Sequence, residues 1–195
     1  MMILKEKLKR LFSRTYKVTV CEMPKNCADA RIFQKLHHAA CYGCEIAIQR
    51  LHELFAINTY EVTNIVPDVY LEALAANMVT AGGSLAAADE LRVTYMAVGT
   101  GAGAEAAGDT TLGTEVFRDT VDSQGDSAKV AYNTLFIGLS EANGNTLAEV
   151  GCFAGAASAA ADSGTLASRT LLAPTIAKTV TKTVTVEVRH TFADA

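Results

Sequence analysis

VTKTVTVEVRHTF, residues 180–192, is the stretch that decides the fold. Its even positions carry the apolar side chains Val180, Val184, Val186, Val188 and Phe192, and the odd positions carry Thr, Glu or Arg. A period of two predicts a β-strand with one buried face and one face in water. His190 falls on the apolar face, where a hydrogen-bonded core histidine is the ordinary explanation.

Five more strand patterns precede this one, and turn signals separate them. They cover residues 93–98, 115–121, 129–138, 147–153 and 166–172. The connections are too short for the crossover helices that a parallel sheet needs. Residues 91–195 therefore favour an antiparallel β-sandwich, jelly-roll-like in its class.

The first ninety residues have a different character. Helical periodicity covers residues 2–14, 28–40 and 45–57, a short strand is expected at 16–21, and Pro67 is placed to open a further helix. The expected buried positions of the middle two helices are Ile32, Leu36, Ile46, Ile48, Leu51, Leu54 and Phe55. The prediction is an α+β chain with three parts: a helical, cysteine-containing anchoring region at 1–60, a helical connector at 61–90, and the sandwich at 91–195.

Charge supports a boundary near residue 60. Residues 1–60 contain ten Lys and Arg against five Asp and Glu, net +5, whereas residues 61–195 contain seven against sixteen, net −9. The basic helix at 2–14 is interpreted as a docking element for a partner or a sister subunit, because its apolar stripe needs a protein surface. No stretch is long and apolar enough to span a bilayer, and the N-terminal charges do not fit a signal peptide. We expect synthesis in the cytoplasm without export.

Four of the five cysteines are close in sequence: Cys21, Cys27, Cys41 and Cys44. Two pairs of thiolates can complete the tetrahedral shell of a structural Zn²⁺ ion, with His37, His38 or His52 as substitute ligands. The five residues between the first pair exceed the usual spacing of two to four. Buried free thiols and disulfides stay open as alternatives.

Other motifs carry less chemistry. The run GTGAGA at 99–104 imitates a dinucleotide fingerprint, but no helix follows it, so a flexible turn is expected instead of a cofactor site. The acidic run comprises Asp109, Glu115, Asp119, Asp122 and Asp126, and it is interpreted as a solvated face. No hydrolase elbow, zinc-protease or P-loop motif is present. The sequence thus predicts no catalytic residues and no cofactor beyond the zinc candidate.

One half of the chain resembles a known kind of module. Its motifs are YMAVGTG at 95–101, GDTTLGTEVFR at 108–118, GLSEANG at 138–144, LAEVGCF at 147–153, LASRTLL at 166–172 and TIAKTV at 175–180. In this order they resemble a recurrent module of tailed-bacteriophage virion proteins, found in capsid decoration, head-fibre and tail-fibre or baseplate proteins. The resemblance covers residues 91–192 and leaves the cysteine cluster outside it.

The resemblance implies a non-enzymatic structural protein that binds and stabilises a particle. We expect a capsid-associated protein of the decoration or head-fibre type, with a tail-fibre or baseplate component as the alternative. A zinc-dependent nucleic-acid-binding protein is a further alternative, although nucleic acid is a disfavoured partner. The expected partners are the major capsid protein or tail components and sister copies in a homo-oligomer, with no small-molecule substrate and no membrane, and the expected location is the virion, assembled in the host cytoplasm.

Overall fold

The alternating stretch at the end of the chain forms strand β9 (Lys182–Phe192), which lies inside a sheet. In the computed structural model, residues 12–63, 66–71 and 91–192 are described. Strand β9 pairs on one side with β1 (Phe12–Glu22) and on the other with β6 (Val130–Ile137). The edge strands β2 (Ala56–Thr63) and β5 (Ser123–Ser127) complete a five-stranded antiparallel sheet, sheet A, in the order β2-β1-β9-β6-β5.

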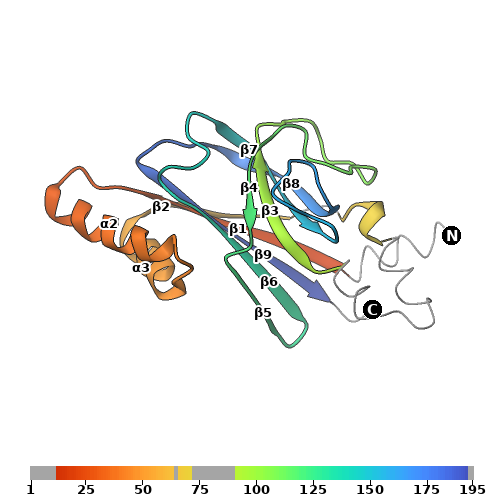
Figure 1. The fold of residues 1–195 in the computed structure, drawn as a ribbon, viewed down its shortest axis with the longest axis horizontal. Coiled ribbons are helices and arrows are strands. Elements are labelled where there is room, and N and C mark those ends of the chain that lie inside the picture. The colour runs from red at the N-terminus through yellow and green to blue at the C-terminus, as the bar shows by residue number, and fades with distance from the viewer. Residues whose placement is uncertain (1–11, 64–65, 72–90, 193–195) are drawn as a thin grey trace.

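A second antiparallel sheet, sheet B, packs against the first. It contains β4 (Glu115–Thr120), β3 (Val93–Gly99), β7 (Thr146–Ala154) and β8 (Thr165–Ala177), in that order. Consecutive strands pair within one sheet, β3 with β4, β5 with β6 and β7 with β8, and the chain then crosses to the other sheet. The expected α+β class with an antiparallel β-sandwich is confirmed (Figure 1).

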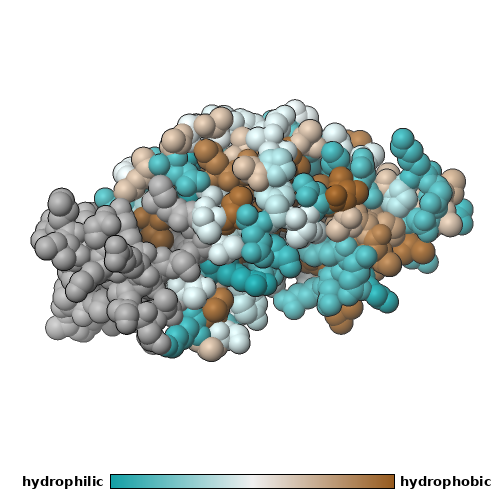
Figure 2. Space-filling view, turned by 180° about the vertical axis from the view of Figure 1, so that it is seen from behind, coloured by the Kyte–Doolittle hydropathy of each residue, from teal (hydrophilic) through white to brown (hydrophobic). Residues whose placement is uncertain are grey.

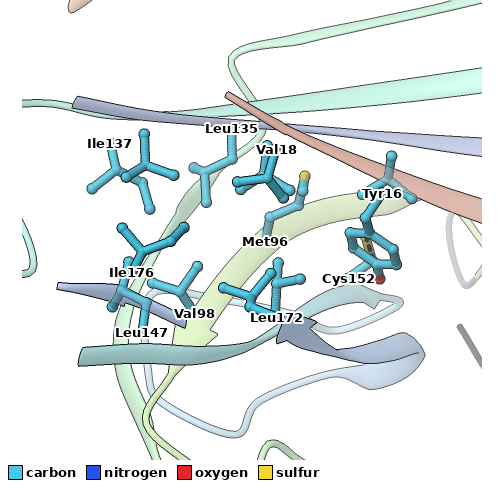
Figure 3. Close-up of a cluster of buried hydrophobic side chains, with 14 of the residues drawn as sticks. Tyr16, Val18, Met96, Val98, Leu135, Ile137, Leu147, Cys152, Leu172 and Ile176 are labelled. Carbon is cyan, nitrogen blue, oxygen red and sulfur yellow. Dashed lines mark hydrogen bonds between the residues drawn. The ribbon is translucent and has the colours of Figure 1, made fainter. Parts of the chain in front are cut away.

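The space between the sheets is filled by aliphatic side chains. Val18, Leu135 and Ile137 come from sheet A and meet Val98, Leu147 and Ile176 of sheet B (Figure 3). Met96 lies between the two sets, and all but Ile176 of these seven residues are completely buried. Because the layers meet along their whole apolar faces, this interior supplies the main hydrophobic contribution to the fold.

Two helices form a hairpin between β1 and β2. Helix α2 (Cys27–Ala40) begins at Asn26, whose side chain accepts a hydrogen bond from the Asp29 backbone N–H at 2.8 Å. The turn before helix α3 (Glu45–Phe55) uses Gly43 with φ +73°, a left-handed conformation that suits glycine. Phe33, Leu51 and Phe136 lie in the contact between the hairpin and the outer face of sheet A.

The helices expose side chains that the periodicity had placed inside. Ile32 is 46% exposed, Ile46 74% and Leu54 55%, whereas Ile48 and Leu51 are buried as expected. The expected burial of those three residues is therefore wrong. The hairpin touches the sheet through one narrow seam, so each helix buries a thinner stripe than its apolar pattern suggests.

Several boundaries also differ from expectation. The second helix ends at Phe55, and the chain continues at once as β2, which the sequence did not predict. Residues 12–14 belong to β1, so they are not helical, and the rest of the expected 2–14 helix lies outside the described residues. Val180 is 66% exposed and precedes β9, because the chain turns there through a hydrogen bond from the Lys182 N–H to the Thr179 carbonyl at 3.1 Å. Residues 68–71 are helical after Pro67, and the remainder of that expected helix falls outside the described residues.

The sandwich does not begin at residue 91. Strand β1 pairs with β9 from Phe12 opposite Phe192 to Glu22 opposite Lys182, and Tyr16, Val18 and Val20 enter the core between the sheets. Residues 12–22 and 56–63 are thus part of sheet A, and the helical hairpin between them lies outside the two layers (Figure 1). The charge and cysteine distributions along the sequence describe local composition. They therefore could not predict that β1 pairs with a strand about 170 residues later.

Candidate functional site

A buried carboxylate organises one side of sheet B. Glu149 of β7 is completely buried, and its oxygens accept hydrogen bonds from the backbone N–H groups of Gly101 (2.9 Å), Gly113 (2.9 Å) and Thr114 (2.8 Å). The Arg169 Nε of β8 donates to the same carboxylate at 2.8 Å. Four donors therefore satisfy one ionised group away from water, which is the condition for burying a charge at tolerable cost.

Arg169 extends this network to the 99–114 loop. Its second guanidinium nitrogen donates to Asp109 Oδ2 at 2.7 Å, and its third donates to the Gly103 carbonyl at 3.0 Å. Asp109 also accepts from the Ala106 N–H at 3.0 Å. One member of the acidic run is thus inside an internal network, and the interpretation of that run as a solvated face is wrong for Asp109.

The glycines of the GTGAG run are explained by the same carboxylate. A Cβ at Gly99 would lie 2.5 Å from Glu149 Oε1, and one at Gly101 would lie 2.3 Å from it. The backbone at Gly99 and Gly101 therefore lies too close to the Glu149 side chain to leave room for a Cβ atom. The run resembles a cofactor motif only because two unrelated structures both need glycine at this spacing.

A second buried ion pair lies on the same outer face of sheet B. Arg118 donates to both carboxylate oxygens of Glu115, at 2.8 and 2.7 Å, and also to the Ser163 carbonyl at 2.9 Å. Its guanidinium carbon lies 3.9 Å above the centre of the Phe153 ring. This arrangement fixes the 154–164 loop on the sheet, and it removes Glu115 from the solvated acidic face as well.

The cysteines are not brought to one point. Cys21 is buried in β1 beneath α3, Cys27 begins α2, and Cys41 and Cys44 follow its other end. A helix of 14 residues is about 21 Å long, so the first and second expected pairs lie apart. None of the five cysteines, Cys152 included, forms a disulfide. In the ranges 12–63, 66–71 and 91–192, no group of three or more His, Cys, Asp or Glu side chains is placed to hold a metal ion.

One cysteine does have a histidine neighbour. Cys41 Sγ lies 3.4 Å from His37 Nε2, but that nitrogen also accepts a hydrogen bond from the Leu139 backbone N–H at 3.0 Å. Burial lowers the pKa of His37 and raises the pKa of Cys41. Both shifts oppose a thiolate–imidazolium pair, so the arrangement docks α2 on the 138–145 loop and does not activate a nucleophile.

His190 and His52 occupy different environments. His190 is 6% exposed on the inner side of β9, and its Nε2 lies 3.2 Å from the Asn133 amide nitrogen, as expected of a core histidine. His52 of α3 reaches the outer face of sheet A, where its Nε2 forms a 2.8 Å hydrogen bond with Thr185 Oγ1. Burial lowers the pKa of His52, and the nearby Lys17 lowers it further.

His52 marks a groove between α3 and sheet A, the α3 groove, with a cavity volume of about 260 Å³. One row of its floor crosses four strands, with Lys17, Glu187, Thr134 and Ser123 side by side. A parallel row contains Thr19 opposite Thr185. The wall is formed by Glu45, Ile48, Gln49 and His52 of α3. The sequence did not predict this groove, because its floor and wall come from β1, α3, β5, β6 and β9, which strand pairing and helix packing bring together.

Tyr132 closes the far side of the α3 groove. A Cβ at the facing Gly125 of β5 would lie 2.4 Å from the Tyr132 hydroxyl oxygen and 2.5 Å from Cζ, so the ring lies across the glycine backbone. The half-buried Tyr132 is one of the residues that line the groove. A glycine facing an aromatic residue on an edge strand was the one sequence signal for this contact.

No family model, curated protein or solved structure matches the chain. Among the helices of the described residues, none combines the length and the hydropathy that crossing a membrane requires.

Proposed function

We propose that this chain is a non-enzymatic structural protein of a bacteriophage particle, associated with the capsid as a decoration or head-fibre protein. The observation that carries the proposal is that the buried charged side chains have structural roles. Hydrogen bonds from or to these side chains hold loops to sheet B; they are Glu149, Arg169, Glu115 and Arg118. The interior between the sheets is filled by apolar side chains, so the molecule has mainly its surface to offer.

These same groups occur in the motifs that resemble phage virion modules. Glu149 and Phe153 belong to LAEVGCF, Arg169 to LASRTLL, and Arg118 to GDTTLGTEVFR. Residues that hold loops to a sheet in this way are what a structural building block requires. The motifs of the resemblance thus contain the residues that stabilise sheet B, and this supports the proposal.

The helical hairpin is the surface best suited to bind a particle. Exposed Ile32, Ile46 and Leu54 lie on it, and Ile57 follows on the edge strand β2. Figure 2 shows such apolar residues among polar ones at the helical end of the molecule. Many copies on one lattice gain avidity, so a modest contact at this end is sufficient for stable attachment.

Antibody labelling of purified phage particles tests the proposal. Gold-labelled antibodies raised against the full chain are expected on the heads of particles produced in a host that carries the gene. Label confined to tails would move the protein to a fibre or baseplate. Particles that carry neither label nor the protein by mass spectrometry would contradict a virion role.

A further inference from the structure

We propose that the α3 groove is a binding site for a neutral saccharide, one sugar ring in size. The inference goes beyond the structural role proposed above, because it assigns a ligand to a surface that the packing of the sandwich does not need.

The first step of the argument is the abundance of hydroxyl and amide groups in the groove. Thr19, Thr185, Thr134 and Ser123 line the floor, Tyr132 closes one side, and the Gln49 amide lies on the wall. Hydroxyl groups donate and accept, and an amide does both through separate atoms. Such a lining pairs with a ligand that alternates donors and acceptors around its edge, as the hydroxyl groups of a pyranose do.

The second step concerns charge. Lys17 lines the groove together with Glu45 and Glu187, and Arg189, outside this lining, donates to Glu187 at 2.6 Å. A phosphate or polyanion site requires an excess of positive charge, whereas this lining has one lysine against two glutamates. The charge of the lining disfavours an anionic ligand, and the carboxylates are available as acceptors for sugar hydroxyl groups.

The third step concerns shape and the aromatic ring. The Tyr132 ring lies across Gly125, which holds it in place, and Tyr132 lines the groove. A fixed aromatic face provides an apolar surface for the C–H groups on one side of a sugar ring. The volume of about 260 Å³ lies just under the range of roughly 300–1,000 Å³ typical of sites for drug-sized ligands, so one ring fits and a large ligand does not.

Nuclear magnetic resonance of the ¹⁵N-labelled full chain tests the site with glucose, galactose, mannose and N-acetylglucosamine at millimolar concentrations. At least one sugar is expected to give saturable shifts confined to amides of α3, β1, β5, β6 and β9. Absence of shifts with all four sugars would overturn the proposal. So would shifts located outside the groove, or equal shifts with inorganic phosphate.

Substitutions test whether the Tyr132 ring contributes to sugar binding, apart from any effect on folding. Tyr132→Leu is expected to weaken binding at least about tenfold, equal to ~1.4 kcal/mol, whereas Tyr132→Phe retains the ring and most of the affinity. Thr134→Val removes one floor hydroxyl and weakens binding, and Thr175→Val makes the same change on exposed β8 and leaves it unchanged. Thermal unfolding of each variant identifies losses caused by misfolding. Equal affinity of the wild type and a folded Tyr132→Leu would refute the site.

Discussion

Glu149 joins three parts of the chain that are distant in sequence. Its carboxylate connects the glycine run after β3, the turn before β4, and Arg169 on β8. In a low-dielectric interior, each of these partners depends on the others, because an unpaired charge or N–H group would be costly. The stability of the loop side of sheet B thus depends strongly on one side chain.

Glu149→Ala is expected to reduce the free energy of unfolding by about 3–5 kcal/mol, because it leaves the Arg169 charge with Asp109 alone and removes the acceptor of three backbone N–H groups. Urea denaturation measures the change. Glu187→Ala is the control, since it breaks an ion pair with Arg189 that is partly exposed to solvent and is worth at most about 1 kcal/mol. Equal effects of the two substitutions would contradict the assigned role of Glu149.

Of two glycines in the 99–103 run, only Gly101 should lose substantial stability on substitution by alanine. Gly101→Ala places a Cβ 2.3 Å from Glu149 Oε1 and should cost about 1–3 kcal/mol of stability. Gly103→Ala meets no atom within 4 Å and should change stability by no more than ~0.5 kcal/mol. The midpoints of denaturant unfolding compare them directly. A harmless Gly101→Ala would show that the loop can move away from the carboxylate.

At the scale of elements, α2 is attached to the 138–145 loop through an acceptor that can be protonated. His37 must be neutral to accept the Leu139 N–H, and its ring packs between Phe33 and Phe136. Burial lowers the pKa of His37 from its ordinary value of 6.5. Between that value and the lower pKa of the folded state, the unfolded chain binds more protons, so this contribution to stability is lost as the pH falls.

His37→Gln is expected to flatten the fall in stability below pH 6.5, since a glutamine oxygen accepts the same hydrogen bond but binds no proton. Thermal unfolding across an acidic pH series provides the measurement. His38→Gln, at an exposed position on the same helix, is the matched control and should leave most of the wild-type slope intact, because His38 is the smallest of the contributions that lower the pKa of His37. Burial also raises the pKa of Asp122 to about 6, which acts in the opposite direction, and this contribution is common to all three proteins. Identical slopes in wild type and His37→Gln would show that the His37–Leu139 hydrogen bond does not cause the fall in stability at acidic pH.

The placement of the cysteines along α2 predicts their reactivity. Cys27, Cys41 and Cys44 are exposed, whereas Cys21 and Cys152 are buried, and burial raises the pKa of Cys21 to about 11. Titration of the native protein with a thiol reagent should therefore modify three thiols rapidly and the other two only on unfolding. Four thiols protected together, and released by a chelator, would instead restore the zinc interpretation.

At the scale of the whole molecule, β1 and β9 make residues 91–192 dependent on the N-terminal part of the chain. Without β1, strand β9 would lose one complete ladder of hydrogen bonds, and the core would lose Tyr16, Val18 and Val20. A fragment of residues 91–195 is expected to lack a cooperative thermal transition by circular dichroism, in contrast to the full chain. A fragment that unfolds cooperatively would support the boundary near residue 60 that the charge pattern indicated.

The sequence predicted the elements whose pattern is local. Alternation identified β9, and helical periodicity identified α2 and α3. Strand β5 has the sequence SQGDS, which is typical of a turn. It forms a strand because it pairs with β6 and because the Tyr132 ring covers Gly125, and neither contact is visible in the local sequence. Of the buried network, one signal was visible in advance: Glu149 is a single charge within the apolar run LAEVGCF. Its partner Arg169 could not be assigned, because the strand register that brings them together is set by tertiary packing.

The antiparallel pairing of Phe12 with Phe192 has a mechanical consequence. Both ends of the described sandwich emerge side by side, and the helical hairpin lies at the far end (Figure 1). Tension applied between the two ends would separate β1 from β9 by breaking their hydrogen-bonded residue pairs one after another. Tension applied between the hairpin and either end would instead pull along the strands and strain many of these pairs at once. A molecule anchored by its hairpin and pulled from its paired ends would therefore resist force far better than one pulled by the ends alone.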